Sequence, residues 1–186
     1  MYSQSMVMRN PGLSDGARFA VNRAAKILAF TLFTAAGAQF AVHLPFTPVP
    51  VTMQTLFVVL SGIVLGPRDG FYAMLSYLAL GLSGAPVFAG LTFGPAVLFG
   101  PTGGYLIAFP AAAFLAGYLP RIAGGKTAAK ALGVISGLAL ILLSGAAYLC
   151  LITGSSFSDA LMLAVTPFII AEIAKSLAAV FIAGRV

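Results

Sequence analysis

Long apolar stretches alternate with short breaks rich in proline, glycine or charge along the chain. Six such stretches can be distinguished, at about 24–44, 52–65, 71–82, 103–119, 131–152 and 161–183. A helix needs about 20 residues to cross the hydrocarbon core of a bilayer, and the second and third stretches are shorter than this. We therefore expect six transmembrane helices, two of which depend on their neighbours to complete the span.

The composition indicates an all-α, polytopic membrane protein. Of the 186 residues, 60% are hydrophobic and only 8% are charged, whereas a soluble domain carries about 25% charged residues. No length remains for a soluble domain, so residues 24–186 are expected to form one six-helix transmembrane domain. Residues 1–23 lack the pattern of a signal peptide and are expected to form a cytoplasmic N-terminal segment.

The basic residues predict the orientation of these helices. Ten lysines and arginines are present, and all but Lys175 precede or open the first stretch, follow the last, or lie in the second or fourth connection. These residues are Arg9, Arg18, Arg23, Lys26, Arg68, Arg121, Lys126, Lys130 and Arg185. The positive-inside rule then places both termini in the cytoplasm, with the protein in the cell (inner/cytoplasmic) membrane. The net charge of +6 thus serves topology and indicates no nucleic-acid partner.

The segment at about 83–102 is rich in glycine and proline and carries no charge. Irregular backbone of this kind cannot face lipid, because its polar groups would lack partners, but it can cover a cavity. We expect an external lid that folds over a pocket. An ordinary interfacial loop is the alternative.

Two charges, Glu172 and Lys175, interrupt the last apolar stretch. A charged residue in the middle of a membrane helix costs about 2.5–3.5 kcal/mol on insertion scales. At i and i+3 the two side chains share one helix face and can pair. The pair either fixes the helix in place or forms a polar spot in a pocket for a small anionic ligand with amide-like donors. Thr166 and Pro167, just before it, predict the start of this helix.

Further polar residues are expected at the same external level. Thr52 and Gln54 open the second stretch, and Tyr105 opens the fourth. A mostly apolar pocket with a few convergent polar groups suits a small organic ligand. Aromatic residues of the lid are candidates for its apolar wall, namely Phe88, Phe93 and Phe99.

Small residues recur at four-residue spacing, which lets helices approach closely. They are Ala25 and Ala29; Ala108, Ala112 and Ala116; and Gly133 and Gly137. Packing within the bundle and docking on a partner subunit are the two interpretations.

Other motifs fail on inspection. GGKT at 124–127 matches the end of a phosphate-binding loop, but Pro120 stands where that motif needs glycine. GLSG at 81–84 is the form found in some intramembrane serine proteases, whose nucleophile needs a nearby base, and the sole histidine is His43. With a single cysteine, Cys150, and one histidine, neither a metal site nor a cofactor is indicated.

Four stretches of the chain resemble the BioY family. They read PFTPVPVTMQTLFVVLSGIVLGPRDG, GLSGAPVFAG, GPTGGYLIAF and, in the last helix, EIAK. BioY is the biotin-specific substrate-binding subunit, or S component, of energy-coupling factor (ECF) vitamin transporters. The resemblance implies the six-helix S-component fold, with biotin bound near the external face under the loop between helices three and four.

The resemblance also implies partners and residue roles. An S component docks on a coupling membrane protein driven by two ATPases, and small residues of its first helix serve the docking, here Ala25 and Ala29. The acidic residue and lysine of the family's last helix map onto Glu172 and Lys175, with glutamate where aspartate is usual. We therefore expect biotin uptake and no enzymatic activity. Rival interpretations are the same fold with another small vitamin, an intramembrane hydrolase, and a purely structural membrane subunit.

Overall fold

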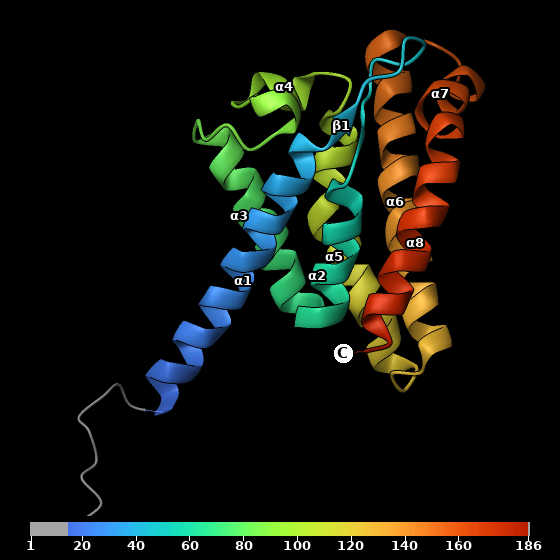
Figure 1. The fold of residues 1–186 in the computed structure, drawn as a ribbon. Helices are drawn as coiled ribbons and strands as arrows, with labels where there is room; N and C mark the ends of the chain where they lie inside the picture. The colour runs from blue at the N-terminus through green and yellow to red at the C-terminus, as the bar shows by residue number, and fades with distance from the viewer. Residues whose placement is uncertain (1–14, 186) are drawn as a thin grey trace, which may run out of the picture.

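The computed structural model describes residues 15–185, which form a bundle of helices (Figure 1). The long elements are α1 (Asp15–Gln39), α2 (Gln54–Leu65), α3 (Pro67–Leu82), α5 (Gly103–Ile122), α6 (Thr127–Thr153) and α8 (Ile169–Ala183). The short ones are β1 (Ala41–Val42), β2 (Val51–Thr52), η1 (Ala89–Leu91), α4 (Ala96–Phe99), α7 (Phe157–Ala164) and η2 (Thr166–Phe168). β1 and β2 pair antiparallel as a small hairpin between α1 and α2.

The observed helix limits differ most from the expected ones in the first and last apolar stretches. The first helix begins at Asp15, well before the apolar stretch, and ends at Gln39, where the hairpin starts. The last apolar stretch is divided between α7 and α8 by a short 3₁₀ turn. Pro167 occupies the beginning of that turn, where its missing N–H and fixed φ fit best, so Thr166-Pro167 does mark the approach to the last helix.

Four helical segments are long and apolar enough to cross a membrane within the described part of the chain. They are Gly16–Gln39, Gly103–Ile122, Thr127–Thr153 and Phe157–Ala183. α2 and α3 have 12 and 16 residues, and both are short for a complete crossing, as expected from the sequence. The helical membrane class is thereby confirmed, and the count of six spans stays a prediction.

α5 lies at the centre of the bundle and packs against α2, α3 and α6. Contact with α2 is made backbone to backbone: a Cβ on Gly62 would come 1.9 Å from the carbonyl oxygen of Ala113. Small residues therefore set the distance between these two helices. The small residues of α5 and α6 are likewise buried between helices, which supports bundle packing for Ala108, Ala112, Ala116, Gly133 and Gly137.

The first helix has a different place in the bundle. α1 packs on α2 and α3, and its N-terminal part extends away from the other helices (Figure 1). Ala25 is exposed and Ala29 is half-buried, so both remain accessible on this outer helix. Near the same end, the Arg23 guanidinium forms a bidentate pair with Asp69 at the start of α3, with Nε–O distances of 2.9 and 3.0 Å.

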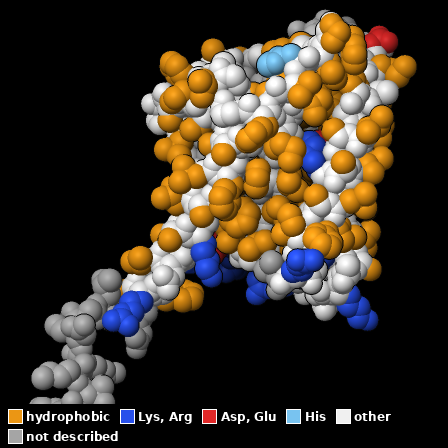
Figure 2. Space-filling model, in the orientation of Figure 1, with side chains coloured by type: hydrophobic (Ala, Val, Ile, Leu, Met, Phe, Trp, Pro, Cys, Tyr) orange, Lys and Arg blue, Asp and Glu red, His pale blue; other side chains and the backbone are white. Residues whose placement is uncertain are grey.

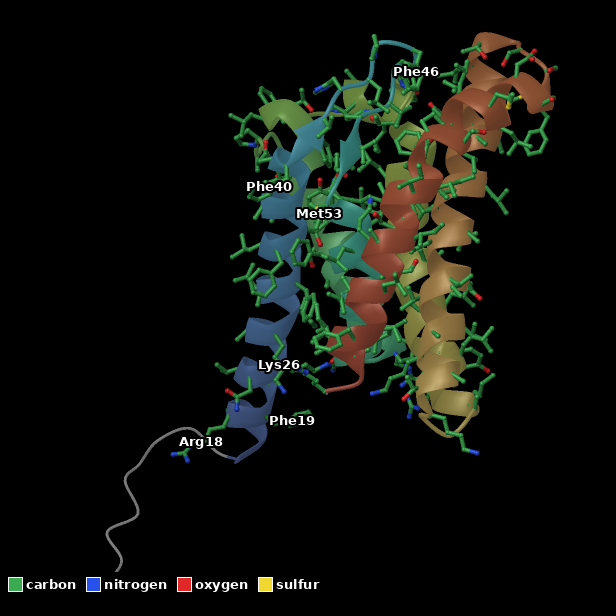
Figure 3. All side chains as sticks on the ribbon, turned by 45° about the vertical axis from the view of Figure 1, so that its right-hand side comes forward. Arg18, Phe19, Lys26, Phe40, Phe46 and Met53 are labelled. Atoms are coloured by element: carbon green, nitrogen blue, oxygen red, sulfur yellow. The ribbon has the colours of Figure 1, made fainter. Side chains whose placement is uncertain are left out.

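Charge is distributed unequally between the two ends of the molecule. Figure 2 shows apolar side chains along the sides of the bundle and most Lys and Arg side chains near its lower end. Figure 3 places Arg18 and Lys26 at that end, and Phe40 and Phe46 toward the opposite one. The hairpin, α4 and α7 lie at the end opposite to the C-terminus (Figure 1). Arg9 lies outside the described residues.

Candidate substrate-binding site

A cavity of about 170 Å³ lies beneath the hairpin and the segment 83–102. Its walls come from six parts of the chain that are distant in sequence: the hairpin, α2, the lid segment, α5, α6 and the start of the last helix. The lining residues are His43, Val49, Pro50, Thr52, Gln54, Thr55, Phe88, Ala89, Thr92, Val97, Thr102, Tyr105, Leu106, Phe109, Leu142, Phe168, Glu172 and Lys175. The segment 83–102 thus contributes five residues to the cavity lining, and its role as a lid stays a prediction.

Glu172 and Lys175 form an ion pair on one wall of this cavity. Both residues are only 6% exposed, and the Lys175 ammonium contacts Oε1 of Glu172 directly. The same ammonium donates to the carbonyl oxygen of Thr52 at 2.9 Å and to Oγ1 of Thr55 at 2.8 Å. An ammonium has three protons, so these three acceptors use all of them. The buried charge is therefore fully compensated, as burial in a membrane helix requires.

Thr55 is a member of this cluster that the sequence did not single out. Its hydroxyl lies 3.1 Å from each carboxylate oxygen of Glu172, to which it donates, and it accepts from Lys175. The threonine thereby joins the pair on α8 to the first turn of α2. Its position beside Gln54 in the TMQT stretch was the sequence feature that could have identified Thr55 as a site residue.

Gln54 connects the floor of the cavity to the lid. Its Nε2 donates to the Tyr77 hydroxyl at 2.6 Å, and that hydroxyl donates to the carbonyl oxygen of Val87 at 3.0 Å. The Thr52 hydroxyl donates to Oε1 of Gln54 at 2.9 Å. This chain fixes the orientation of the Gln54 amide, and its second Nε2 hydrogen faces no acceptor among the hydrogen bonds of the described residues.

Tyr105 lines the cavity with its ring. Its hydroxyl donates to the carbonyl oxygen of Ala164 at 2.7 Å, so its single proton is already committed to the end of α7. The ring lies 6.2 Å from that of Phe168, centroid to centroid. The sequence placed Tyr105 correctly at the cavity, and the structure gives it an aromatic rather than a polar surface there.

The aromatic residues of the lid divide into two groups. Phe88 lines the cavity and is 1% exposed, with its ring against Gly81 and 5.5 Å from the ring of Tyr77. Phe93 and Phe99 are 58% and 77% exposed and do not belong to the cavity lining. The structure therefore does not place Phe93 in the cavity wall, and its role in binding stays a prediction.

Other cavity residues were missed or undervalued from sequence. His43 was considered an interfacial residue, yet the hairpin brings it to the cavity. Thr92 and Thr102 add two hydroxyls from the lid segment, and Phe109 and Phe168 add apolar surface from α5 and η2. Their participation depends on contacts between distant segments, which no local pattern reveals.

These features define a class of protein. A helical membrane protein with a lidded cavity near one end, lined by a few convergent polar groups, is a membrane-embedded binding protein for a small molecule. The family model for "BioY family" matches residues 8–186, and the chain belongs to this family. The resemblance recognised in the sequence is confirmed.

Named relatives and a solved structure agree with this assignment. The chain is 45% identical over 156 residues to "Probable biotin transporter BioY" of Pyrococcus horikoshii, covering 84% of this chain and 90% of that protein. It is 42% identical over 156 residues to "Biotin transporter BioY2" of Lactococcus lactis, covering 82% and 86%. Its fold matches the crystal structure of the S-component for biotin from an ECF-type ABC transporter, with a TM-score of 0.85, 25% identity and 94% of each chain covered. The chain therefore has the S-component fold.

Proposed function

We propose that this protein is the biotin-binding S component of an ECF transporter, that it takes up biotin, and that it has no enzymatic activity. The observation that carries the proposal is the cavity of this BioY-family chain, whose lining combines the compensated Glu172–Lys175 pair with apolar residues of the lid and α5. The names of the relatives and of the solved S component support biotin as the ligand.

The cavity suits the two chemical ends of biotin. The fused ureido ring carries two N–H donors and one carbonyl acceptor, whereas the valerate chain ends in a carboxylate. Glu172 and Lys175 together carry no net charge, and the protons of Lys175 are all donated within the protein. We propose that the ureido ring binds at this wall, with Glu172 accepting from an N–H and Gln54 donating its free amide hydrogen to the carbonyl. Thr52, as a partner of Gln54, positions that amide.

The apolar parts of biotin then meet the apolar parts of the cavity. The thiophane ring and valerate chain would contact Phe88, Tyr105 and Phe109, and the carboxylate would lie toward the hydroxyl of Thr102 in the lid segment. Phe93 has no part in this arrangement.

Uptake also requires an orientation and partners. We propose six transmembrane spans in the cytoplasmic (inner) cell membrane, with both termini inside. Most Lys and Arg side chains lie near the lower end in Figure 2, whereas the cavity lies beneath the hairpin at the other end. Residues 24–186 would form the single membrane domain, residues 1–23 the cytoplasmic N-terminal segment, and 83–102 the external lid. The accessible small residues of α1, Ala25 and Ala29, would dock on the energy-coupling membrane protein, which ATPase subunits drive.

Equilibrium binding of labelled biotin to the purified protein in detergent tests the proposal directly. We expect saturable binding by the parent and a loss of at least about tenfold in affinity for Lys175→Ala and Glu172→Ala, because each leaves a buried charge without its partner. Size-exclusion profiles control for folding. No binding by a folded parent would refute biotin as the ligand, and a panel of other vitamins would identify the alternative.

The rival classes receive less support. A hydrolase needs a nucleophile beside a base, but the Ser83 hydroxyl donates to the carbonyl oxygen of Leu80 in its own helix turn. A purely structural role for the ion pair does not account for its position on a cavity wall. Binding that survives both substitutions would nevertheless return the pair to that role.

A further inference from the structure

The last residue of α1 reaches across to the lid. Nε2 of Gln39 donates to the carbonyl oxygen of Phe88 at 3.1 Å, and the N–H of Leu91 donates to Oε1 of Gln39 at 3.1 Å. The other Nε2 proton goes to the carbonyl oxygen of Ala35, one turn earlier in α1, at 3.2 Å. A single amide therefore brackets the η1 turn from both sides, and its own helix fixes its orientation.

The bracketed turn has an unfavourable backbone. Leu91 has φ of +57°, the sole positive φ of a non-glycine residue in the described part of the chain. A left-handed conformation costs such a residue roughly 1–2 kcal/mol. Leu91 is also one of the two lid residues whose backbone Gln39 holds. The strain and the hydrogen bond thus occur at the same place, and the bond opposes relaxation of the turn.

The same turn forms part of the cavity wall. Phe88 immediately precedes η1 and Ala89 begins it, and both line the cavity. Other hydrogen bonds hold the lid from α3 and α6. Tyr77 Oη donates to the carbonyl oxygen of Val87, the N–H of Gly94 donates to the carbonyl oxygen of Gly81 at 2.8 Å, and the Tyr148 hydroxyl on α6 donates to the carbonyl oxygen of Leu98 at 2.9 Å. Gln39 supplies the attachment on the α1 side, at the edge where the lid meets solvent.

We propose that Gln39 is a positioning residue that holds η1 over the occupied cavity and thereby slows the departure of the ligand. Identification of that ligand as biotin rests on the proposed function, whereas the hold on the lid does not. Gln39 lies outside the cavity lining and acts on the ligand through Phe88 and Ala89. Its loss should therefore change the rate of dissociation much more than the rate of association.

Two variants and one control separate this role from general stability. Gln39→Ala removes both lid hydrogen bonds, whereas Gln39→Glu keeps the acceptor for Leu91 N–H and loses the donation to Phe88. Ser83→Ala is the matched control, since Ser83 is exposed at the start of the lid and its hydroxyl bonds only to the carbonyl oxygen of Leu80 among the contacts of the described residues.

The first measurement needs no ligand. Hydrogen exchange of lid peptides covering 85–99, followed by mass spectrometry on the purified protein, should speed up about fivefold in Gln39→Ala, less in Gln39→Glu, and not in Ser83→Ala. Exchange in α5 and α6 peptides should stay unchanged in all three. Unaltered lid exchange in Gln39→Ala would overturn the proposal whether or not the protein binds biotin.

The second measurement follows labelled biotin after a chase with unlabelled biotin. The dissociation rate should rise about fivefold in Gln39→Ala, the value expected for two solvent-exposed hydrogen bonds, with an association rate close to that of the parent. Faster lid exchange with an unchanged dissociation rate would show that the contact does not retain the ligand, and would refute the role. Failure of the parent to bind biotin would refute the proposed function alone, since the exchange experiment decides the lid contact separately.

Discussion

The ammonium nitrogen of Lys175 lies 2.9 Å from the carbonyl oxygen of Thr52, although 123 residues separate them in the chain. This hydrogen bond ties the last helix to the end of β2, two residues before α2 begins. Thr52 is the last residue of β2 and lies outside α2. The buried lysine thus both donates to a backbone carbonyl oxygen and forms part of a cavity wall. Its contributions to stability and to ligand binding can be measured separately by substitution.

Replacing both members of the ion pair should harm stability less than replacing one. Lys175→Met or Glu172→Leu alone leaves a buried charge, and we expect a loss of about 3–5 kcal/mol in unfolding free energy for either. The double variant Glu172→Leu/Lys175→Met should recover most of that loss and still fail to bind biotin. Thermal unfolding in detergent together with biotin binding measures both. A double variant as unstable as the sum of the singles would contradict the expected compensation.

Thr55 should matter through its hydroxyl alone. Thr55→Val keeps the shape but removes a group that bonds to both Glu172 and Lys175, and hydrogen bonds to charged groups contribute about 1.5–3 kcal/mol. We expect biotin affinity to fall at least about tenfold, and Thr55→Ser to retain most of it. Titration of labelled biotin compares the two variants. Equal affinities would mean that the hydroxyl is dispensable.

The two lid phenylalanines should respond oppositely. Phe88→Ala opens a void beneath the lid, because the ring is buried against Gly81 and Tyr77, and a cost of about 3–5 kcal/mol is expected. Phe93→Ala, at a site with an exposed side chain, should change stability by less than about 0.5 kcal/mol and leave biotin affinity intact. Chemical or thermal unfolding and biotin titration provide the comparison. A strong binding defect in Phe93→Ala would indicate a different lid position in the bound state.

Substitution of Gly62 tests the close approach of α2 and α5. An added methyl at Gly62 would meet the carbonyl oxygen of Ala113 at 1.9 Å, so Gly62→Ala should separate the helices and lower the yield of folded protein. Gly16→Ala is the control, since nothing lies within 4 Å of the new methyl and alanine favours the helix by about 1 kcal/mol. Monodisperse protein recovered after detergent extraction is the measure. Normal recovery of Gly62→Ala would contradict the observed backbone contact.

The sequence predicted those parts of the site that depend on local geometry. Glu172 and Lys175 meet because residues i and i+3 share a helix face. The proline turn before them favours the start of a helix. Gln54, Thr52, Tyr105 and Phe88 also line the cavity, although Thr52 ends β2 instead of opening the second helix, and their roles in binding stay predictions.

The remaining contacts could not be predicted because they join distant segments. Nothing in the sequence around Gln39 indicates that its amide bonds to the lid, and His43 reaches the cavity only through the fold of the hairpin. Phe88 is buried and Phe93 is exposed, but both lie in an irregular segment. Such a segment has no periodic pattern from which buried and exposed positions could be distinguished. The start of α1 at Asp15 was missed because a polar helix can extend beyond the apolar core of a membrane.

The break between α7 and α8 has a consequence for how the external end is assembled. In an unbroken helix the N–H of residue 167 would bond to the carbonyl oxygen of Leu163, but Pro167 has no N–H. That oxygen instead accepts from the Thr47 hydroxyl at 2.9 Å, and the next one, of Ala164, accepts from Tyr105. Pro167 thus leaves the carbonyl oxygens of Leu163 and Ala164 free to accept hydrogen bonds from the hairpin and α5. In Pro167→Ala the carbonyl oxygen of Leu163 should accept from the N–H of residue 167, and its hydrogen bond from Thr47 should be lost. Amide hydrogen exchange at 43–51 should then become faster.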